Sequence, residues 1–251
     1  MGMSTRTAAM LKRAEEPRGE GTPCPLDANA LYRLMTWLSP AYPVGAFSYS
    51  GGIEWAVEAG DIRDAVSLQA WLAVMIADGG TFCDAVFFAH AYCAAVAGDD
   101  AALRTVAELA VAFAPAKERH LETTAQGRAF LDTTRAAWPA PALERLAALA
   151  EDAVALPVAV AVACAGHGIA LFPSLHCHVH AAAANLVSAG VRLIPLGQSD
   201  GQRVLAALEP IVAAAATRAL ATALDDAGGA ALRADIAGMR HETQYTRLFR
   251  S

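Results

Sequence analysis

Apolar residues return at three- and four-residue intervals along most of this chain, and that periodicity constrains the fold more than any other feature. One such series consists of Leu31, Leu34, Met35 and Leu38, and another extends from Leu68 to Ile76. Spacing of this kind places apolar side chains on one face of an α-helix. No stretch alternates apolar and polar residues in the way that a half-buried strand does.

The composition agrees with the periodicity. The chain is rich in alanine, and hydrophobic residues make up 55% of the sequence. Alanine, leucine, arginine and glutamate all favour helices. A chain of 251 residues is long enough to bury one large core. The segments between the periodic stretches are short, as in helical bundles. We therefore predict an all-α, single-domain helical bundle of about ten helices.

Three regions are expected along the chain: a flexible N-terminal tail at 1–26, the all-α domain at 27–238, and a partner-binding C-terminal tail at 239–251. The start of the chain carries mixed charges and lacks the apolar core of a signal peptide.

The sequence has five cysteines and no CxxC pair among them; they are Cys24, Cys83, Cys93, Cys164 and Cys177. Four of them lie among apolar residues, as reduced, buried thiols do, so a cytoplasmic location is expected.

Charge and hydropathy argue against nucleic acid and membranes as partners. A net charge of −6 supplies no basic field for phosphate backbones. The segment 153–172 is long enough to span a bilayer. Its apolarity comes mostly from alanine and glycine, which gain little in lipid, and Pro157 interrupts it. We interpret it as a fully buried central helix.

The sequence contains none of the common catalytic or nucleotide-binding motifs. GxxxxGK, GxGxxG, GxSxG and HExxH are all missing. Ser48 and Ser50 in the FSYS segment would need an adjacent base to act as nucleophiles, and the sequence supplies none. A hydrolase or transferase centred on FSYS would have to show activity as an isolated protein, and we predict that the chain is not an enzyme.

The densest group of metal-binding residue types is the HCHVH segment at 176–180. On a helix, His176 and His180 lie one turn apart on the same face and could share nickel or zinc, while His178 faces elsewhere. Two imidazoles are too few for a closed site. The alternative is an amphipathic helix whose histidines lie on a solvated or interface face, and both interpretations stay open.

Four local features lead to further predictions. Ser199 and Gln202 have the spacing of a reciprocal capping pair, which predicts a helix starting there. Pro210 predicts a kink or break in that helix. The segment 225–238 has no helical periodicity. The charged cluster 117–122 is typical of a solvated helix face, and a partner surface is the alternative.

The C-terminal segment MRHETQYTRLFRS combines arginines and aromatic residues of the kind enriched at binding hot spots. A terminus of this composition suggests folding on contact with a partner. The alternative is that the segment docks on its own domain.

Four blocks, in order, resemble the UreF family of urease accessory proteins. They are LSPAYPVGAFSYSGGIE at 38–54, KERHLETTAQGRAFL at 117–131, NLVSAGVRLIPLGQSDGQRVLAAL at 185–208 and MRHETQYTRLFRS at 239–251. The resemblance spans residues 27 to 251. This chain departs from it at HCHVHAAAA, where relatives tend to have aromatic residues and a glutamine.

The resemblance implies a cytoplasmic, all-α urease maturation protein that forms a homodimer. It implies two accessory partners, the UreD/UreH scaffold protein and the GTPase UreG, and GTP-dependent nickel insertion into apo-urease. No tightly bound cofactor is implied, since nickel is handled by the complex. The motif positions expected to contact partners are Pro43, Gly45, Phe47, Ser48, Tyr49, Glu54, Arg240, His241, Glu242, Thr243, Gln244, Tyr245, Arg247, Leu248 and Phe249. The alternative is a nickel-binding metallochaperone that uses His176 and His180.

Overall fold

The protein was analysed as a computed structural model, which describes residues 26–150 and 152–251. Cys24 and all but the last residue of the expected N-terminal tail lie outside the described residues. The described residues form α-helices joined by short loops and contain no strand, which confirms the all-α prediction. The helices are α2 (Ala28–Trp37), α3 (Ile53–Glu58), α4 (Ala65–Asp78), α5 (Gly80–Ala97), α6 (Asp100–Ala112), α7 (Lys117–Ala137), α8 (Pro141–Leu149), α9 (Leu156–Gly166), α10 (Leu171–Leu193), α11 (Gln198–Ala221) and α12 (Leu232–His241), with 3-10 turns η1 (Ala46–Ser48) and η2 (Leu224–Asp226).

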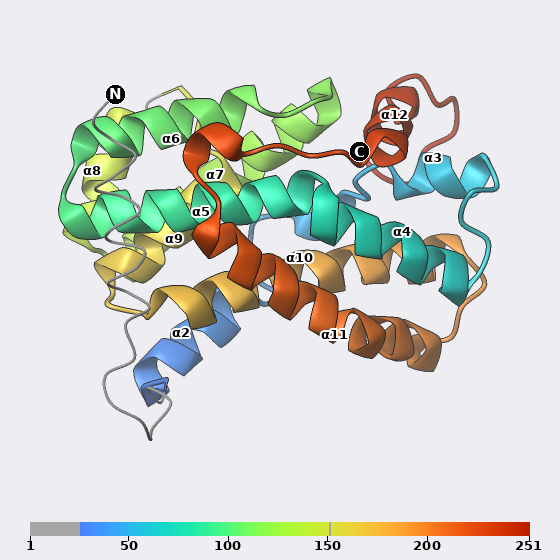
Figure 1. Ribbon diagram of the computed structural model, residues 1–251, viewed down its shortest axis with the longest axis horizontal. Helices are drawn as coiled ribbons and strands as arrows, with labels where there is room; N and C mark the ends of the chain where they lie inside the picture. Colours follow the sequence, from blue (N-terminus) through green and yellow to red (C-terminus); the bar gives the residue numbers. More distant parts are fainter. Residues whose placement is uncertain (1–25, 151) are drawn as a thin grey trace.

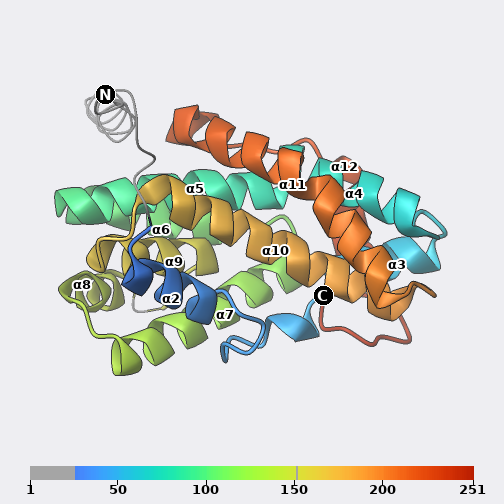
Figure 2. The ribbon, with the colours of Figure 1, turned by 90° about the horizontal axis from the view of Figure 1, so that it is seen from below.

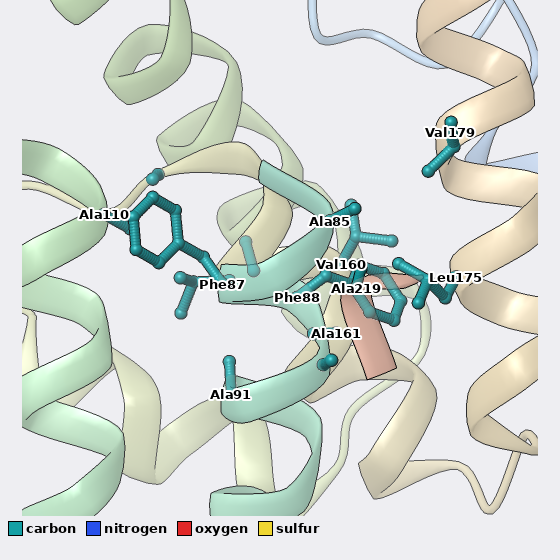
Figure 3. Close-up of a cluster of buried hydrophobic side chains, with 14 of the residues drawn as sticks. Ala85, Phe87, Phe88, Ala91, Ala110, Val160, Ala161, Leu175, Val179 and Ala219 are labelled. Atoms are coloured by element: carbon teal, nitrogen blue, oxygen red, sulfur yellow. The ribbon is translucent and has the colours of Figure 1, made fainter. Parts of the chain in front are cut away.

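Helix α5 lies at the centre of the bundle. It packs against α4, α6, α9, α10 and α11, and Figures 1 and 2 show these helices around it. Its side chains are buried almost all round, as expected for an apolar core helix. Phe87 points towards α6, and Phe88 points between α9 and α10, where Leu175 lies (Figure 3). The core therefore wraps around α5, and the remaining helices present their outer faces to solvent.

Several helix boundaries follow from local chemistry that is visible in the sequence. Asp64 caps α4 by accepting a 2.8 Å hydrogen bond from the Ser67 amide, and the Ser67 hydroxyl accepts from the Asp64 amide. Asp99 caps α6 in a similar way by accepting from Ala102. Gly98 ends α5 with a φ of 66°, a left-handed conformation that glycine adopts without strain.

The central apolar segment is shorter than predicted. Only Leu156–Gly166 is helical, with Pro157 in its first turn, and the side chains from Pro157 to Cys164 are buried. Gly168, with a φ of 67°, turns the chain so that α10 can start at Leu171. Two other stretches, 65–97 and 198–221, are long and apolar enough to cross a membrane. The first consists of α4 and α5, which are separated at Gly79, and more than half of its most apolar window is buried inside the bundle.

Three local predictions need correction. Ser199 is not a cap, because α11 already begins at Gln198 and Asp200 accepts a 3.2 Å hydrogen bond from the Gly197 amide. The helix continues through Pro210 without a break. The segment predicted to lack periodicity contains α12, which crosses the expected boundary between residues 238 and 239.

Gly127 permits the close approach of α7 to the segment that leads into α9. A Cβ atom at this position would lie 2.0 Å from the Val154 carbonyl oxygen and 2.8 Å from the Ala155 carbonyl carbon. Both are backbone atoms, so a side chain can be accommodated only if the two segments separate.

We predict that Gly127→Ala lowers the free energy of unfolding by at least about 3 kcal/mol, because overpacking forces backbone shifts. Gly80→Ala is the matched control, since nothing lies within 4 Å of its Cβ position. The control should remain within about 1 kcal/mol of wild type. Urea denaturation followed by circular dichroism measures both, and equal midpoints would contradict the close packing.

Candidate functional site

The loop between α2 and α3 and the C-terminal end of the chain lie against each other. Gly51 and Gly52 have φ angles of 61° and 81°, which turn the chain into α3. A Cβ atom on Gly52 would lie 2.6 Å from the Gly238 backbone nitrogen. The second glycine is thus required both for the turn and for contact with α12.

Glu54, in the first turn of α3, holds the C-terminal segment. Its carboxylate accepts hydrogen bonds from the backbone amides of Leu248 (2.6 Å) and Phe249 (2.9 Å). It also contacts the Nε2 atom of His241 at 3.0 Å. Burial alone would raise the pKa of Glu54, but these hydrogen bonds outweigh it and leave the pKa lower than usual. Glu54 is therefore a buried anion that organises three donors.

His241 is completely buried and bridges two carboxylates. Its Nδ1 atom lies 2.6 Å from Glu118 Oε2, and its Nε2 atom faces Glu54. Carboxylates only accept hydrogen bonds, so both ring nitrogens donate and the imidazole is the doubly protonated cation. Arg247 adds a second cation, 2.6 Å from the other Glu118 oxygen. We call Glu54, Glu118, His241 and Arg247 the clamp.

Beyond the clamp, the last two residues of the chain also form backbone hydrogen bonds with the loop before α3. The Arg250 amide donates to the Ser48 carbonyl at 2.8 Å, and the Ser50 amide donates to the Ser251 carbonyl at 2.7 Å. The Ser50 hydroxyl donates to the same carbonyl, and Ser50 is fully buried, so its hydroxyl proton takes part in docking the C-terminal residue. Phe249 is buried under the Arg192 guanidinium, which lies 4.3 Å from the ring centre.

A second ionic group lies beside the docked terminus. Arg119 forms ion pairs with Asp84 and, at 3.7 Å, with Glu122. Burial raises the pKa of both the Asp84 and Glu122 carboxyls, while the Arg119 charge opposes the shift. The Ser251 hydroxyl donates to Glu122 at 3.2 Å. This group therefore touches the end of the docked segment.

The same residues line an open cavity of about 360 Å³ between α10, α7 and the loop after α2. Ala181, Ala182 and Ala184 form part of its wall, at the segment where the chain departs from its resemblance. Burial, with the charge of Arg119, lowers the pKa of His178 to about 4, so this cavity histidine is neutral at pH 7. Small alanine side chains leave space here that bulkier residues would fill.

The structure divides the expected partner-contact residues into three sets by their exposure to solvent. Those that face inwards and are buried are Tyr49, Glu54, His241 and Phe249. Those that are half-buried are Gly45, Ser48, Glu242 and Gln244. Those that face solvent are Pro43, Phe47, Arg240, Thr243, Tyr245, Arg247 and Leu248. The motif at 240–249 thus combines side chains that dock the segment on its own domain with side chains left free on its outer face.

The sequence analysis missed the α7 half of the site. Glu118 is buried and Arg119 and Glu122 are largely covered, so the prediction of a solvated helix face is wrong for these three residues. Glu118 and Glu122 share four-residue spacing with the buried Gln126 and Phe130. That spacing places the two glutamates on the core side of α7 and could have located them. Ser50 and Arg192 were also missed.

The HCHVH segment divides as its helical spacing predicted. His178 is buried beside Phe88, whose ring centre lies 5.1 Å away. His176 is half-buried and His180 is exposed. Across the described residues, no group of three or more histidine, cysteine or acidic side chains is placed to hold a metal ion.

Three cysteines are buried thiols. Burial raises the pKa of Cys83 and Cys93 to about 11 and that of Cys164 to about 12, so these thiols are protonated at neutral pH.

The fold and the site together define an all-α protein in which a buried ionic site holds the protein's own C-terminal segment against the bundle. Comparison with known proteins identifies the family. The sequence profile of UreF matches residues 62–209. The urease accessory protein UreF of Bradyrhizobium diazoefficiens is 58% identical over 242 residues, which cover 96% of this chain and 100% of that protein.

Two further relatives have the same name. The urease accessory proteins UreF of Rhodopseudomonas palustris strains HaA2 and BisB18 are 60% and 62% identical, over 92% and 89% of this chain and 99% and 93% of theirs. The chain therefore belongs to the UreF family of urease accessory proteins, and the resemblance seen in its four sequence blocks is confirmed.

We predict that Glu54→Gln releases the C-terminal segment and lowers the free energy of unfolding by about 3 kcal/mol, because it leaves the buried His241 cation with one anion fewer. Glu58→Gln, an exposed change in the same helix, should stay within about 0.5 kcal/mol of wild type. Limited proteolysis after residue 241 and urea denaturation measure the two effects. Equal protection of the segment in both variants would contradict the role of Glu54.

A pH dependence follows from the lowered pKa of Glu54. A carboxyl group with a depressed folded-state pKa stabilises the fold at pH values above its unfolded pKa. Docking should therefore be complete at neutral pH, begin to weaken below about 4.5, and be lost as the pH falls through the folded-state value. The amide chemical shifts of Leu248 and Phe249 report this titration, and Glu54→Gln should abolish it.

Proposed function

We propose that this protein is a non-catalytic assembly factor for urease maturation. It forms a homodimer and bridges the UreD/UreH scaffold protein and the GTPase UreG, so that GTP hydrolysis is coupled to nickel insertion into apo-urease. Family membership supports the urease role. The main structural support for the proposed bridging role is the set of large side chains exposed on the outer face of the docked C-terminal segment.

That outer face presents large side chains on a fixed backbone. Tyr245 is fully exposed, at 102% of its reference area, and Leu248 and Phe47 are 67% and 63% exposed. The clamp holds the backbone beneath them through Glu54 and Glu118. A surface ordered before binding loses less entropy when a partner docks, and aromatic and arginine side chains contribute strongly to protein interfaces.

Helix α12 extends this face. Leu232, Ile236 and Met239 recur at four- and three-residue spacing and are 69%, 55% and 47% exposed. Exposed apolar side chains grouped on one helix face indicate an interaction site more strongly than scattered ones. We call α12 together with Phe47, Tyr245 and Leu248 the C-terminal face, and we assign it to the scaffold protein.

A second apolar surface lies on α2, at the opposite end of the molecule (Figure 1). Leu31, Tyr32 and Met35 are 46%, 66% and 68% exposed there. Two separate surfaces suit a protein that must contact another copy of itself and a different partner simultaneously. We assign the α2 surface to the homodimer.

The remaining parts of the proposal concern cofactors and cellular location. We propose that this chain holds no tightly bound cofactor, that the assembled complex handles nickel, and that the protein acts in the cytoplasm without nucleic acid or membrane partners. The alternative function, a nickel metallochaperone using His176 and His180, is favoured by the four-residue spacing of the two imidazoles on α10, where His180 is exposed and His176 is half-buried. Within residues 26–150 and 152–251, no group of three or more histidine, cysteine or acidic side chains is placed to complete such a site.

We predict that the double change Tyr245→Ala and Leu248→Ala weakens capture of the co-expressed scaffold protein at least about 30-fold, which corresponds to about 2 kcal/mol for loss of a hot spot. Folding should be preserved because both side chains are exposed. Val66→Ala, a 77% exposed position on α4, is the control. Pull-down with the scaffold protein and the GTPase of the same urease cluster measures the effect. Full capture by the double variant would exclude the C-terminal face as the scaffold site.

A further inference from the structure

One wall of the open cavity between α7 and α10 is a single side of α10. Four of the α10 residues that line it recur at three- and four-residue spacing; they are His178, Ala181, Ala182 and Asn185. Such spacing places side chains next to each other on a helix. The two alanines leave open space between two side chains that can form hydrogen bonds.

His178 has hydrogen-bonding atoms that the protein does not use. The residue is only 6% exposed, and it lines the cavity. Its ring nitrogens form no hydrogen bond with any residue that the structure describes, and burial and the charge of Arg119 alone lower its pKa. Buried polar groups in native proteins nearly always have a partner. The imidazole is therefore available to a molecule in the cavity.

The opposite wall, supplied largely by α7, carries more negative than positive charge. Arg119 is close enough to affect His178, and it forms ion pairs with both Asp84 and Glu122. One cation thus serves two carboxylates. The Gln126 side chain, only 3% exposed, donates a 3.3 Å hydrogen bond to Glu122. Its own carbonyl oxygen accepts no hydrogen bond within the described part of the chain.

A further carboxylate adds to the excess of negative charge. Asp235 of α12 lines the same cavity, and no cation among the described residues forms an ion pair with it. Burial raises the pKa of Asp84, Glu122 and Asp235, because removing an anion from water is unfavourable. A positive charge inside the cavity would offset this cost.

The rest of the lining suits an organic molecule. Phe130, Val160 and Leu186 belong to it, so much of the wall is apolar. Small-molecule sites typically bury an apolar body and orient it through a few polar groups. An ammonium group donates three hydrogen bonds and accepts none, which matches the carboxylates and the unused Gln126 oxygen. Among residues 26–150 and 152–251, no group of three or more ligating side chains is placed to hold a metal ion instead.

We propose that the cavity between α7 and α10 binds a small organic cation. Its ammonium or guanidinium group lies against Glu122 and Gln126, and its apolar stem lies along Ala181 and Ala182. His178 takes a hydrogen bond from the same cationic group. This inference goes beyond the proposed assembly function, which needs no ligand in this chain.

Isothermal titration calorimetry of the full chain tests the charge preference with three probes of equal chain length, hexylamine, hexanol and hexanoate. One hexylamine should bind per chain, with a dissociation constant of about 1 mM or lower, as expected for a ligand of this size. It should bind at least about 10-fold more tightly than hexanol, because charge-assisted hydrogen bonds are stronger than neutral ones. No saturable binding of hexylamine, equal affinity for the alcohol, or tighter binding of hexanoate would overturn the proposal.

Nuclear magnetic resonance locates the probe on the protein. Saturating hexylamine should shift the ring nitrogen signals of His178 and the side-chain amide signals of Gln126. The side-chain amide of Gln202, exposed at the start of α11, is the control and should not move. Shifts that leave both His178 and Gln126 unchanged would place the probe elsewhere and reject the cavity.

Filling the cavity should remove its ligand. Ala182→Leu occupies the space along α10 and should weaken hexylamine and hexanol alike, each by at least about 10-fold. Ala206→Leu, the same change at an exposed alanine on α11, is the matched control and should bind both probes as wild type does. Unchanged binding by Ala182→Leu would contradict the assigned position of the stem.

Removing charge should affect only the amine. Glu122→Gln keeps the shape of the wall and should reduce the preference for hexylamine over hexanol to about 3-fold or less. Asp235→Asn removes a carboxylate without breaking an ion pair, and it should lower the same ratio even if Glu122→Gln fails to fold. A purely structural role would weaken both probes equally. An unchanged ratio in both variants would overturn the proposal.

Discussion

The buried His241 cation between two carboxylates is the interaction on which the functional end of the molecule depends. Glu54 and Glu118 lie on α3 and α7, and His241 ends α12, so one imidazole ties together three helices that are far apart in sequence. A buried charge is tolerated only when it is paired and hydrogen-bonded. Each of the three partners therefore needs the other two, and removing one leaves an uncompensated charge in the interior.

The ionic bridge explains why one short motif serves two purposes. Within residues 240–249, His241 and Phe249 point inwards, while Tyr245 and Leu248 point outwards. The inward side chains and the backbone amides bonded to Glu54 fix the position of the outward ones. Docking on its own domain and contacting a partner were alternative hypotheses for this segment in the sequence. In the docked conformation Tyr245 and Leu248 stay exposed on the outer face of the segment. Docking on its own domain is therefore compatible with contacting a partner.

Local chemistry in the sequence was sufficient to predict most helices, because caps, glycines and apolar spacing act over a few residues. Asp64 and Ser67 form a reciprocal cap of α4 that their spacing in the sequence allows, and the apolar series around Leu68 and Leu72 faces the core. The same kind of rule failed at Ser199, because the cap residue of α11 is Gly197, whose amide donates to the Asp200 carboxylate. Pro210 was expected to disturb α11, but the helix continues through it.

The clamp could be predicted only in part, because its energetics depend on contacts between distant segments. His241 and Glu54 belong to motifs that mark them as special, whereas Glu118 lies in a charged stretch of the kind that usually faces solvent. What places Glu118 inside is the position of α12, whose apolar spacing at Leu232, Ile236 and Met239 marks its exposed face and not the side that carries His241. Burying a carboxylate becomes favourable only once His241 and Arg247 are in place. The four-residue spacing of Glu118 with Gln126 and Phe130 therefore indicates the core side of α7, but it does not identify these two partners.

Helix α10 supports the docked C-terminal segment from one of its ends. Arg192 in its last turn donates to the Phe47 carbonyl at 2.9 Å and covers the Phe249 ring, so this end of the helix supports the C-terminal face. The other end carries His176 and His180. An α-helix rises about 1.5 Å per residue, so the 16 residues from 176 to 192 separate the two ends by roughly 24 Å. Because α10 is continuous from Leu171 to Leu193, the cavity wall formed by Ala181, Ala182 and Ala184 and the arginine that covers Phe249 hold a fixed position relative to each other.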